Sequence, residues 1–215
     1  MEIKLNILYD IVLNLLYRQN SKNNLEYKSV CPQSIIQVSI AETFNLYDQT
    51  SINFLYKFNH NKLMFIDHTK VLKVFNSLIA ISIENMGCQG NLWFHTYEVI
   101  HKGNIYIKFH IGNDNQYMNK HNLVTYFTYD FHNYDAGKEK YFLSLKEIKA
   151  IIESHGGKIW CQSEINSNFP NGKFEFIFIL PISKEYYKKL PTILPKDSIQ
   201  IFKYSRVFRR IKNFF

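Results

Sequence analysis

Histidine, cysteine and glycine are the residues whose types and spacing could support chemistry in this chain of 215 residues. Its three cysteines, Cys31, Cys88 and Cys161, lie far apart and are odd in number, so they predict neither a disulfide framework nor a zinc-binding CxxC pair. The eight histidines lie between His60 and His155 without the spacing of metal ligands. We therefore expect no catalytic residue, no metal site and a reducing compartment.

The triplet His155-Gly156-Gly157 is the most distinctive short pattern. It follows apolar residues at helical spacing, which are Leu145, Ile148, Ile151 and Ile152, and glycine at that place indicates the end of a helix. Two paired strands are predicted after it, over residues 158–164 and 173–180, across a turn rich in Asn, Pro and Gly. We expect His155 to cap and pack against the helix, and the other seven histidines to be mostly exposed.

Elements upstream of this triplet must position any site, and their pattern predicts the fold class. Two helices are predicted before the first strand, over residues 3–19 and 32–47. The later predictions are a hairpin of strands 52–58 and 63–66, a helix from the N-cap Asp67 to Gly87, strands 91–100 and 105–111, and a surface loop over 112–140. This order indicates an α+β, two-layer α/β sandwich, in which helices cover one face of a mixed, mostly antiparallel sheet.

The segment from Ile151 to Ile182 resembles the end of the ATP-binding domain of sensor histidine kinases. In that family a helix ends in an H-G-G turn, and a strand, a Gly turn and a strand closing in L-P follow. Residues Asp67–Phe75 resemble the start of the helix that carries the family's N-box. Residues 90–94 and 107–111 resemble the strands that follow it. The resemblance covers roughly residues 30–182 and implies a histidine kinase-like ATPase of the GHKL superfamily, with its Bergerat-type fold.

The resemblance also assigns positions to a nucleotide site. The family's two N-box asparagines, which hold Mg²⁺, fall on Ser77 and Ile81, and an isoleucine cannot ligate a cation that demands oxygen ligands. The first glycine box, with the aspartate that recognises adenine, falls on a stretch containing Asn113, Asp114 and Asn115; a shift of one residue would place Asp114 in the adenine role.

The second glycine box falls on residues 140–145, where no glycine remains. Lys138 and Lys140 are the candidate phosphate contacts there, as point charges. The predicted N-terminal helix also lacks a histidine that could accept a phosphoryl group. We therefore expect no cofactor, with Mg-ATP as the ligand if the site is residually functional, and the sequence leaves open whether the chain is an enzyme.

Charged residues are distributed unevenly along the chain. The formal charge is +8, with 26 Lys and Arg against 18 Asp and Glu, and a lysine-rich composition also fits an AT-rich genome. Residues 183–215 hold nine of the basic side chains and two of the acidic ones, so the rest of the chain is nearly neutral. We therefore divide the chain into an N-terminal amphipathic helix and linker (1–25), a kinase-like domain (26–182) and a basic tail (183–215). The tail predicts a last helix, whose charged candidates are Lys203, Arg206, Arg209 and Arg210.

Three functions remain open from the sequence. The first is an ATP-silent pseudokinase that docks a response regulator or a histidine kinase in two-component signal transduction. The second is a divergent, active histidine kinase fragment that binds ATP. The third is a module that binds an anionic membrane surface through its basic C-terminal helix; nucleic acid is a poor match, because basic and aromatic residues do not interleave on a recognisable fold.

Two further expectations concern assembly and location. The apolar stripe of the N-terminal helix cannot be buried by one helix alone, so it must meet the domain or a second copy in a homodimer. No apolar run approaches the roughly 18 residues that span a bilayer. We therefore expect a cytoplasmic protein.

Overall fold

The computed structural model describes residues 25–47, 51–101, 103–114, 116–128, 142–182 and 199–202. These residues form four helices and eight strands. The helices are α2 (Pro32–Phe44), α3 (His68–Asn85), α4 (Lys120–Thr125) and α5 (Leu145–Ser154). The strands are β1 (Tyr27–Val30), β2 (Ser51–Phe58), β3 (Met64–Asp67), β4 (Gln89–His101), β5 (Asn104–Asn113), β6 (Lys158–Asn166), β7 (Phe169–Pro181) and β8 (Ile199–Phe202).

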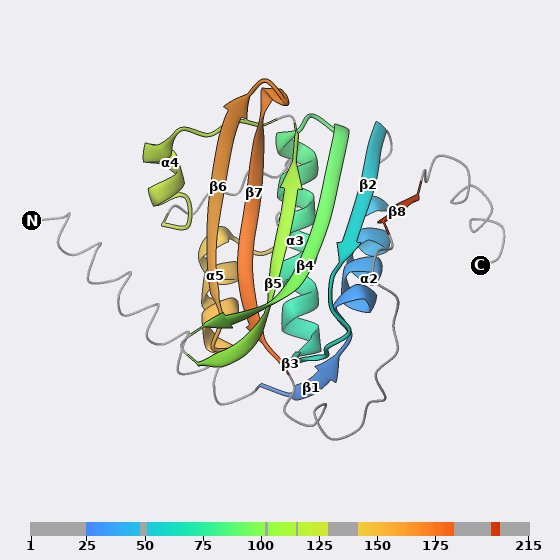
Figure 1. Cartoon of the computed structure of the whole chain (residues 1–215), viewed down its shortest axis with the longest axis vertical. Helices are drawn as coiled ribbons and strands as arrows, with labels where there is room; N and C mark the ends of the chain where they lie inside the picture. Colours follow the sequence, from blue (N-terminus) through green and yellow to red (C-terminus); the bar gives the residue numbers. More distant parts are fainter. Residues whose placement is uncertain are drawn as a thin grey trace, which may run out of the picture.

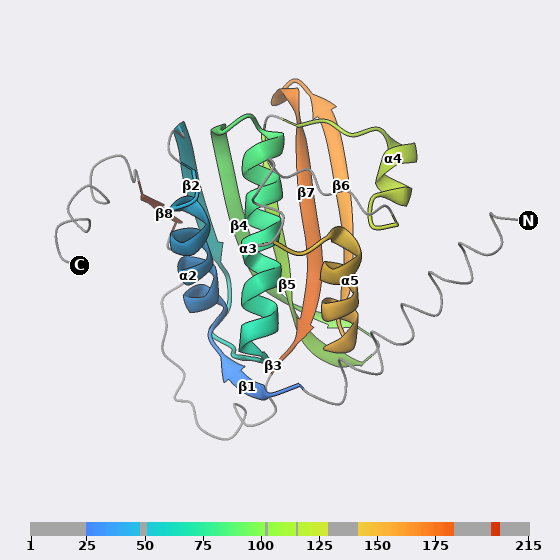
Figure 2. The same cartoon turned by 180° about the vertical axis from the view of Figure 1, so that it is seen from behind.

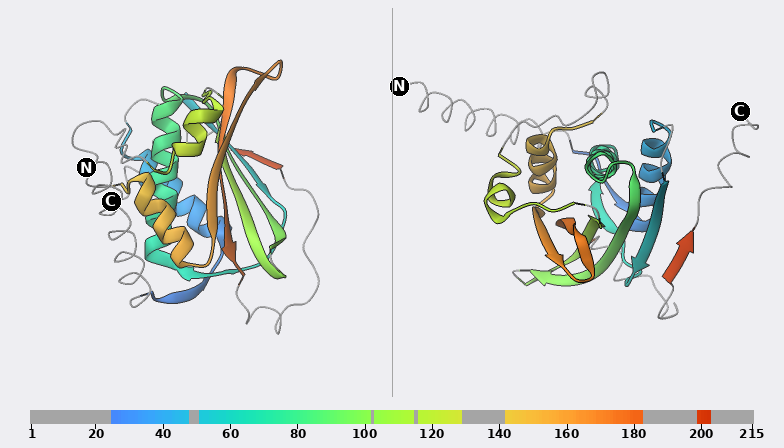
Figure 3. Two further views of the ribbon diagram at one scale, coloured as in Figure 1. Left: turned by 90° about the vertical axis from the view of Figure 1, so that its left-hand side faces the viewer. Right: turned by 90° about the horizontal axis from the view of Figure 1, so that it is seen from above.

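The main sheet has six strands in the order β6-β7-β5-β4-β2-β8. Only β2 and β4 pair in parallel, and the other neighbours are antiparallel. Helices α2, α3 and α5 cover one face of this sheet, and Figure 1 looks onto the opposite, outer face. Figure 2 shows the helix layer and Figure 3 the two layers from the side. The predicted α+β sandwich with helices on one face is confirmed.

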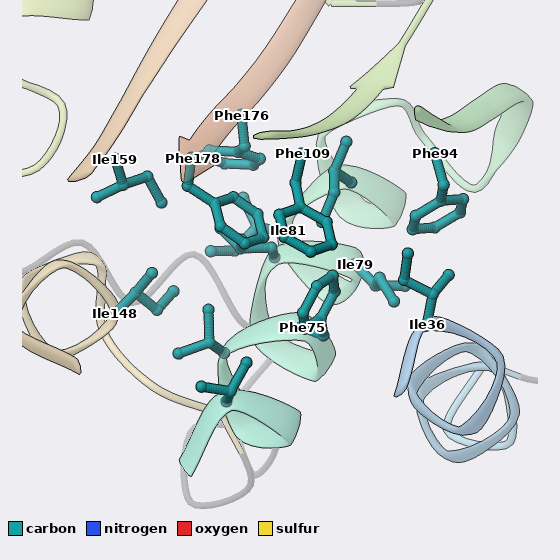
Figure 4. Close-up of a cluster of buried hydrophobic side chains, with 14 of the residues drawn as sticks. Ile36, Phe75, Ile79, Ile81, Phe94, Phe109, Ile148, Ile159, Phe176 and Phe178 are labelled. Carbon is teal, nitrogen blue, oxygen red and sulfur yellow. The ribbon is translucent and has the colours of Figure 1, made fainter. Parts of the chain in front are cut away.

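Phenylalanine side chains fill the space between the helices and the sheet. Phe75 of α3 makes edge contacts with Phe109 of β5 and Phe178 of β7, each with ring centroids 5.4 Å apart, and Phe109 stacks on Phe178 at 4.7 Å. Figure 4 shows these rings together with Ile148 from α5 and Ile36 from α2. Burying each such side chain contributes roughly 1.5–3 kcal/mol, so this layer holds the helices on the sheet.

The start of α3 and the end of α5 are joined by His155. The Asp67 side chain caps α3 by accepting a hydrogen bond from the Lys70 N–H at 3.0 Å. The Asp67 N–H in turn donates to Nε2 of His155 at 3.0 Å, while Nδ1 of His155 lies 2.7 Å from the Ile151 carbonyl. An imidazole with its proton on Nδ1 satisfies both contacts. His155 is buried, so its predicted capping and packing role is confirmed.

Gly157, the second residue after His155, is required by a close backbone contact. A Cβ atom on Gly157 would lie 2.2 Å from the Ile179 carbonyl oxygen and 3.0 Å from that of Ile152. No side chain fits at these distances. The His155-Gly156-Gly157 turn therefore brings α5 close against β7, and this contact explains the pattern in physical terms.

The predicted hairpin of residues 52–58 and 63–66 is wrong in its pairing, although both strands exist. Strand β2 pairs with β4, and β3 pairs with β1 in a separate two-stranded sheet. The intervening residues redirect the chain instead of reversing it, since the Asn59 N–H donates to the Thr96 carbonyl and the Lys62 N–H donates to His60. A local turn signal could not distinguish these two outcomes.

Other predicted elements are longer or are placed differently. Strands β6 and β7 extend into the predicted turn as far as Asn166 and Phe169, and the loop over 112–140 contains the short helix α4. Ile201 and Phe202 lie in the tail for which a last helix is predicted, but they belong to strand β8, which pairs with β2. The predicted N-terminal helix and residues 203–215 lie outside the described residues. None of the described helices combines the length and apolar composition that a bilayer-spanning helix requires.

Replacing His155 with alanine tests the link between α3 and α5. We expect the free energy of unfolding to fall by about 2–3 kcal/mol, because the change leaves a cavity and an unpaired Asp67 N–H. Burial lowers the pKa of His155 from 6.5, so the unfolded chain takes up the proton first as the pH falls. Stability is thus lost below about pH 6.5 in the native chain, and H155A should lose part of this dependence in urea titrations.

The exposed His121 provides the control for this substitution, because H121A should leave the free energy of unfolding unchanged. His60, whose pKa burial lowers to about 4, and His95, whose pKa is also lowered, act with the same sign. H155A should therefore flatten the pH profile without abolishing its slope. An H155A profile parallel to that of the native chain would contradict the proposed protonation state.

Candidate nucleotide site

The hydroxyl of Ser77 is bonded within the protein. Ser77 lies on α3 and is fully buried, and its Oγ donates to the Lys73 carbonyl at 2.7 Å. The same Oγ accepts a hydrogen bond from the Leu143 N–H at 2.8 Å. Leu143 belongs to the stretch that resembles the second glycine box. A backbone amide and an N-box side chain at positions that the resemblance assigns to phosphate and Mg²⁺ therefore bond to each other.

Ile81 points into the core one turn further along α3. It is 5 % exposed and belongs to the main apolar cluster, and Figure 4 shows it beside Phe178 and Phe109. An apolar side chain at this depth offers no oxygen to a cation. The α3 face on which the resemblance places the metal ligands is thus part of the packing between helix and sheet.

Asn113 and Asp114 follow one another at the end of β5 but face different partners. Asn113 is fully buried, its Nδ2 donates to Gln116 Oε1 at 3.1 Å, and its Oδ1 accepts no hydrogen bond from the described residues. The Asp114 carboxylate accepts from both the backbone N–H and the side-chain amide of Asn91 on β4. Asp114 therefore fastens β5 to β4. Of these two neighbouring residues, Asn113 is the one with an acceptor atom that has no partner among the described residues.

Two aromatic side chains after α4 enter the core beside this position. The Tyr126 ring lies 5.6 Å from Phe174 and 6.0 Å from Phe176, and Phe127 lies 6.3 Å from Phe176, between centroids. Both are less than 10 % exposed. Asn85, one turn beyond Ile81 on α3, donates to the Tyr126 hydroxyl at 3.5 Å, and burial raises the Tyr126 pKa to about 12. These rings thus lie between β7 and the α3 face that carries the N-box positions.

Strand β6 holds the segment that carries these rings. The Met118 N–H donates to Ser163 Oγ at 2.9 Å, and the Cys161 thiol donates to the Leu123 carbonyl at 3.7 Å. Burial raises the pKa of Cys161 to about 12, so the thiol keeps its proton. Helix α4 begins at its cap, Asn119, which accepts from the Asn122 N–H. The segment from Gln116 to Thr128 is therefore packed against the sheet.

Several candidate residues fall outside the described part of the chain. These are Asn115, Lys138 and Lys140 of the nucleotide positions, and Lys203, Arg206, Arg209 and Arg210 of the tail. Within the described residues, the site retains an amide oxygen that could accept a hydrogen bond, but its backbone amide and hydroxyl groups are paired internally. No three His, Cys, Asp or Glu side chains among those residues come together as metal ligands would.

A second polar cluster, which the sequence did not predict, lies on the outer face of the sheet around Glu175. Trp93, Gly112, Glu175 and Gln162 stand opposite one another on four neighbouring strands. Gly112 leaves room for the Trp93 indole, because a Cβ atom there would lie 2.6 Å from both Trp93 and Glu175. The Trp93 Nε1–H donates to one carboxylate oxygen of Glu175 at 2.9 Å, and the side-chain amide of Gln162 donates to the other at 2.7 Å.

Charged and aromatic groups complete this cluster. Lys173 Nζ lies 3.2 Å and His110 Nδ1 lies 3.6 Å from Glu175 oxygens, and the Tyr97 hydroxyl lies 2.6 Å from His110 Nε2. Burial alone would raise the pKa of Glu175, which is 3 % exposed. The hydrogen bonds from His110, Trp93 and Gln162 and the Lys173 charge outweigh burial and lower it to about 2. Glu175 is therefore an anion at neutral pH.

The expectation that the other histidines are mostly exposed is wrong. Of the six that the structure describes, only His121 is exposed, and the partly buried ones are His60, His68, His95, His101 and His110. His132 lies outside the described residues. Alternation along each strand places Trp93, His95 and Tyr97 on one face. The sequence shows that alternation, but it does not show which residues of β5 and β7 stand opposite them, so the cluster could not be found.

Comparison with known proteins identifies solved structures that share this fold. No family model matches the chain, and no curated protein matches it. Solved structures do match. The catalytic domain of histidine kinase ThkA has a TM-score of 0.58 at 20 % identity, over 73 % of this chain and 95 % of that one. The mycobacterial sensor histidine kinase MprB has a TM-score of 0.60 at 13 % identity, and the match covers 73 % of this chain and 98 % of that one.

Two further structures extend the comparison. Histidine kinase AdeS of Acinetobacter baumannii has a TM-score of 0.54 at 15 % identity, covering 84 % of this chain and 81 % of that one. ThkA solved in complex with the response regulator TrrA has a TM-score of 0.58 at 20 % identity, and the match covers 85 % of this chain and 50 % of that one. The chain therefore has the fold of a histidine kinase-like ATPase domain, as the resemblance in its sequence implies.

Replacing Ser77 with alanine tests the bond across the candidate site. We expect S77A to lower the free energy of unfolding by about 1–2 kcal/mol and to speed hydrogen exchange at the Leu143 amide, because that N–H loses its acceptor. Ser82 is the matched control: it lies on the same helix, is fully buried and makes the same bond to the fourth residue before it. Unchanged exchange at Leu143 in S77A would show that the bond does not form.

Replacing Glu175 with glutamine tests the charge of the outer cluster. With a folded-state pKa of about 2 against an ordinary 4.5, the unfolded chain binds the proton first as the pH falls. The native chain should therefore lose stability between about pH 4.5 and 2. We expect E175Q to be less stable by about 2–3 kcal/mol at pH 7 and to lack this acid-dependent loss. Glu164, which is half-exposed and also contacts Lys173, is the control, and equal profiles for E164Q and E175Q would contradict the assignment.

Proposed function

We propose that the chain is a histidine kinase-like protein of two-component signal transduction that does not bind Mg-ATP and acts as a docking or scaffold module. The observation that carries this proposal is the hydrogen bond between the Leu143 N–H and Ser77 Oγ. It pairs two groups that a nucleotide site of this type would need free. The fold, which matches the catalytic domains of histidine kinases, supports the kinase-like part of the proposal.

Three structural features support the loss of nucleotide binding. Ile81 replaces a possible metal ligand with an apolar side chain of the core. Tyr126 and Phe127 occupy space beside α3 with aromatic rings that contact β7. Asp114 is bonded to Asn91 and is thereby held away from the adenine role. Asn113 keeps one acceptor atom, and a single neutral hydrogen bond of about 1 kcal/mol does not suffice to hold a nucleotide.

The proposed docking role rests on the intact helices and strands around this site. The helix layer, the sheet and the turn at His155 are all formed, so the chain retains a folded surface while the chemistry of the site is lost. ThkA, which has this fold, was solved in complex with the response regulator TrrA. By analogy, a response regulator or a partner kinase is the proposed ligand of this chain.

Calorimetric titration of the full chain with Mg-ATP tests the proposal, with ShkA, which was solved with AMPPNP, as the positive control. We expect no saturable heat at millimolar nucleotide, because the phosphate and metal contacts are missing. The same chain, immobilised, should bind at least one response regulator of its organism with an affinity that Mg-ATP does not change. Micromolar Mg-ATP affinity would overturn the ATP-silent assignment in favour of a divergent active kinase. Failure of every response regulator to bind would overturn the docking role.

A further inference from the structure

The outer face of the sheet divides into two halves of different charge. Near the turn between β6 and β7, the carboxylates Glu164 and Glu175 contact Lys173, and Asp114 lies at the same end of the sheet, bonded to Asn91. The other half, toward the start of β5, carries lysines and aromatic residues. We call it the cationic half and define it by Lys57, His95, Tyr97, Lys108, Lys158 and Trp160.

Strand register places these residues in two adjacent rows. Lys57 stands opposite His95, and Trp160 lies in the same row three strands further along. In the next row Tyr97 stands opposite Lys108, and Lys158 follows two strands away. None of the positions of these two rows that face outward holds a carboxylate. The three lysines make no ion pair among the described residues, and Lys57 and Lys158 are exposed.

Lys108 lies at the centre of this half, above two aromatic rings. Its Nζ is 5.6 Å from the centroid of Tyr97 and 5.4 Å from that of Trp160. This geometry fixes an ammonium group over a flat aromatic base. Tyr and Trp combined with lysine are the residues that favour the boundary between water and lipid, where rings meet the interface and ammonium groups meet phosphate.

The described chain leaves and rejoins the main sheet beside the cationic half, on either side of residues 183–198. Residues 183–198 leave the sheet at Ile182, whose N–H donates to the Ile105 carbonyl, and return at Ile199, which stands opposite Lys57. This segment carries four lysines against Glu185 and Asp197. The two described residues that flank this segment, Ile182 and Ile199, therefore lie next to the cationic half.

We propose that the cationic half of the outer face binds an anionic phospholipid membrane surface. Its width supports this partner: Lys57 and Lys158 are four strand spacings apart, which is roughly 19 Å, so the lysines suit several headgroups rather than one small anion. Clusters of lysine near a bilayer contribute affinity with each charge. This site differs from the tail residues Arg206, Arg209 and Arg210, and it does not depend on the proposed loss of ATP binding.

The observations favour lipid over other polyanions. Single-stranded nucleic acid is held by bases stacked on open aromatic faces, but Lys108 already lies over Tyr97 and Trp160. An acidic protein surface is a weaker match, because lysine is depleted where proteins meet each other. A headgroup phosphate requires only the ammonium groups, and Lys57 and Lys158 are exposed.

Co-sedimentation of the full chain with vesicles tests the proposal. Vesicles of neutral phosphatidylcholine should bind weakly, and vesicles that also contain anionic phosphatidylglycerol should bind strongly, with an affinity that falls as salt is added. The triple variant K57Q/K108Q/K158Q should weaken anionic binding on the order of 100-fold. Two matched triples remove the same charge elsewhere: K28Q/K73Q/K120Q from exposed positions outside this face, and R206Q/R209Q/R210Q from the tail. All four proteins should give the same far-ultraviolet circular dichroism and cooperative unfolding.

Tryptophan fluorescence gives a second, local readout. The chain has two tryptophans, and both lie on the outer face, so anionic vesicles should shift its emission to the blue and brominated lipid should quench it. The W160F variant should lose most of this response. Equal weakening by all three triple variants, loss of binding only in the tail variant, or a vesicle-bound protein without a fluorescence change would overturn the proposal. Tighter binding of an oligonucleotide or polyglutamate than of vesicles, abolished by the sheet triple, would also overturn it.

Discussion

Burial of α3 on several sides is the constraint on which the rest of the structure depends. Ten of its eighteen residues are buried, more than one helical stripe requires, because the helix meets the sheet, α2 and α5 together. Phe75 fixes its depth against Phe109 and Phe178, and Asp67 with His155 fixes its start. A helix held in this way has little freedom to keep polar groups for a ligand.

The state of the candidate site follows from this constraint. Ser77 and Ile81 lie on the part of α3 that faces the core, so each must be satisfied within the protein. Ser77 achieves this with the Lys73 carbonyl and the Leu143 amide, and Ile81 by contact with apolar side chains. The aromatic rings of Tyr126 and Phe127 extend the same apolar packing. These interactions at the candidate site also stabilise the fold, so we expect a single substitution not to free its polar groups for a ligand.

The sequence predicted what local signals determine and missed what depends on long-range pairing. The cap at Asp67, the apolar stripe that ends at His155 and the strands over residues 91–100 and 105–111 are local signals, and the structure confirms them. The pairing of β2 with β4 joins segments far apart in the chain, and no turn residue specifies it. The order and spacing of the motifs located the candidate site. The hydrogen bond between Ser77 and Leu143 joins residues that are 66 positions apart, and the sequence around neither residue predicts it.

The outer face shows that the fold alone does not explain the residues of this sheet. No described helix covers that face, so packing against a second layer does not dictate its side chains, and exposed polar residues would satisfy the strands at no desolvation cost. Glu175 is nevertheless buried there as an anion and requires four neighbours to satisfy it. Lys57, Lys108 and Lys158 beside it have no carboxylate partner within the described part of the chain. Charge separated in this way across one face weakens the isolated domain, because like charges repel and opposite charges are kept apart. Negative charge placed against the cationic half would offset this repulsion, and the proposed anionic membrane surface supplies such charge.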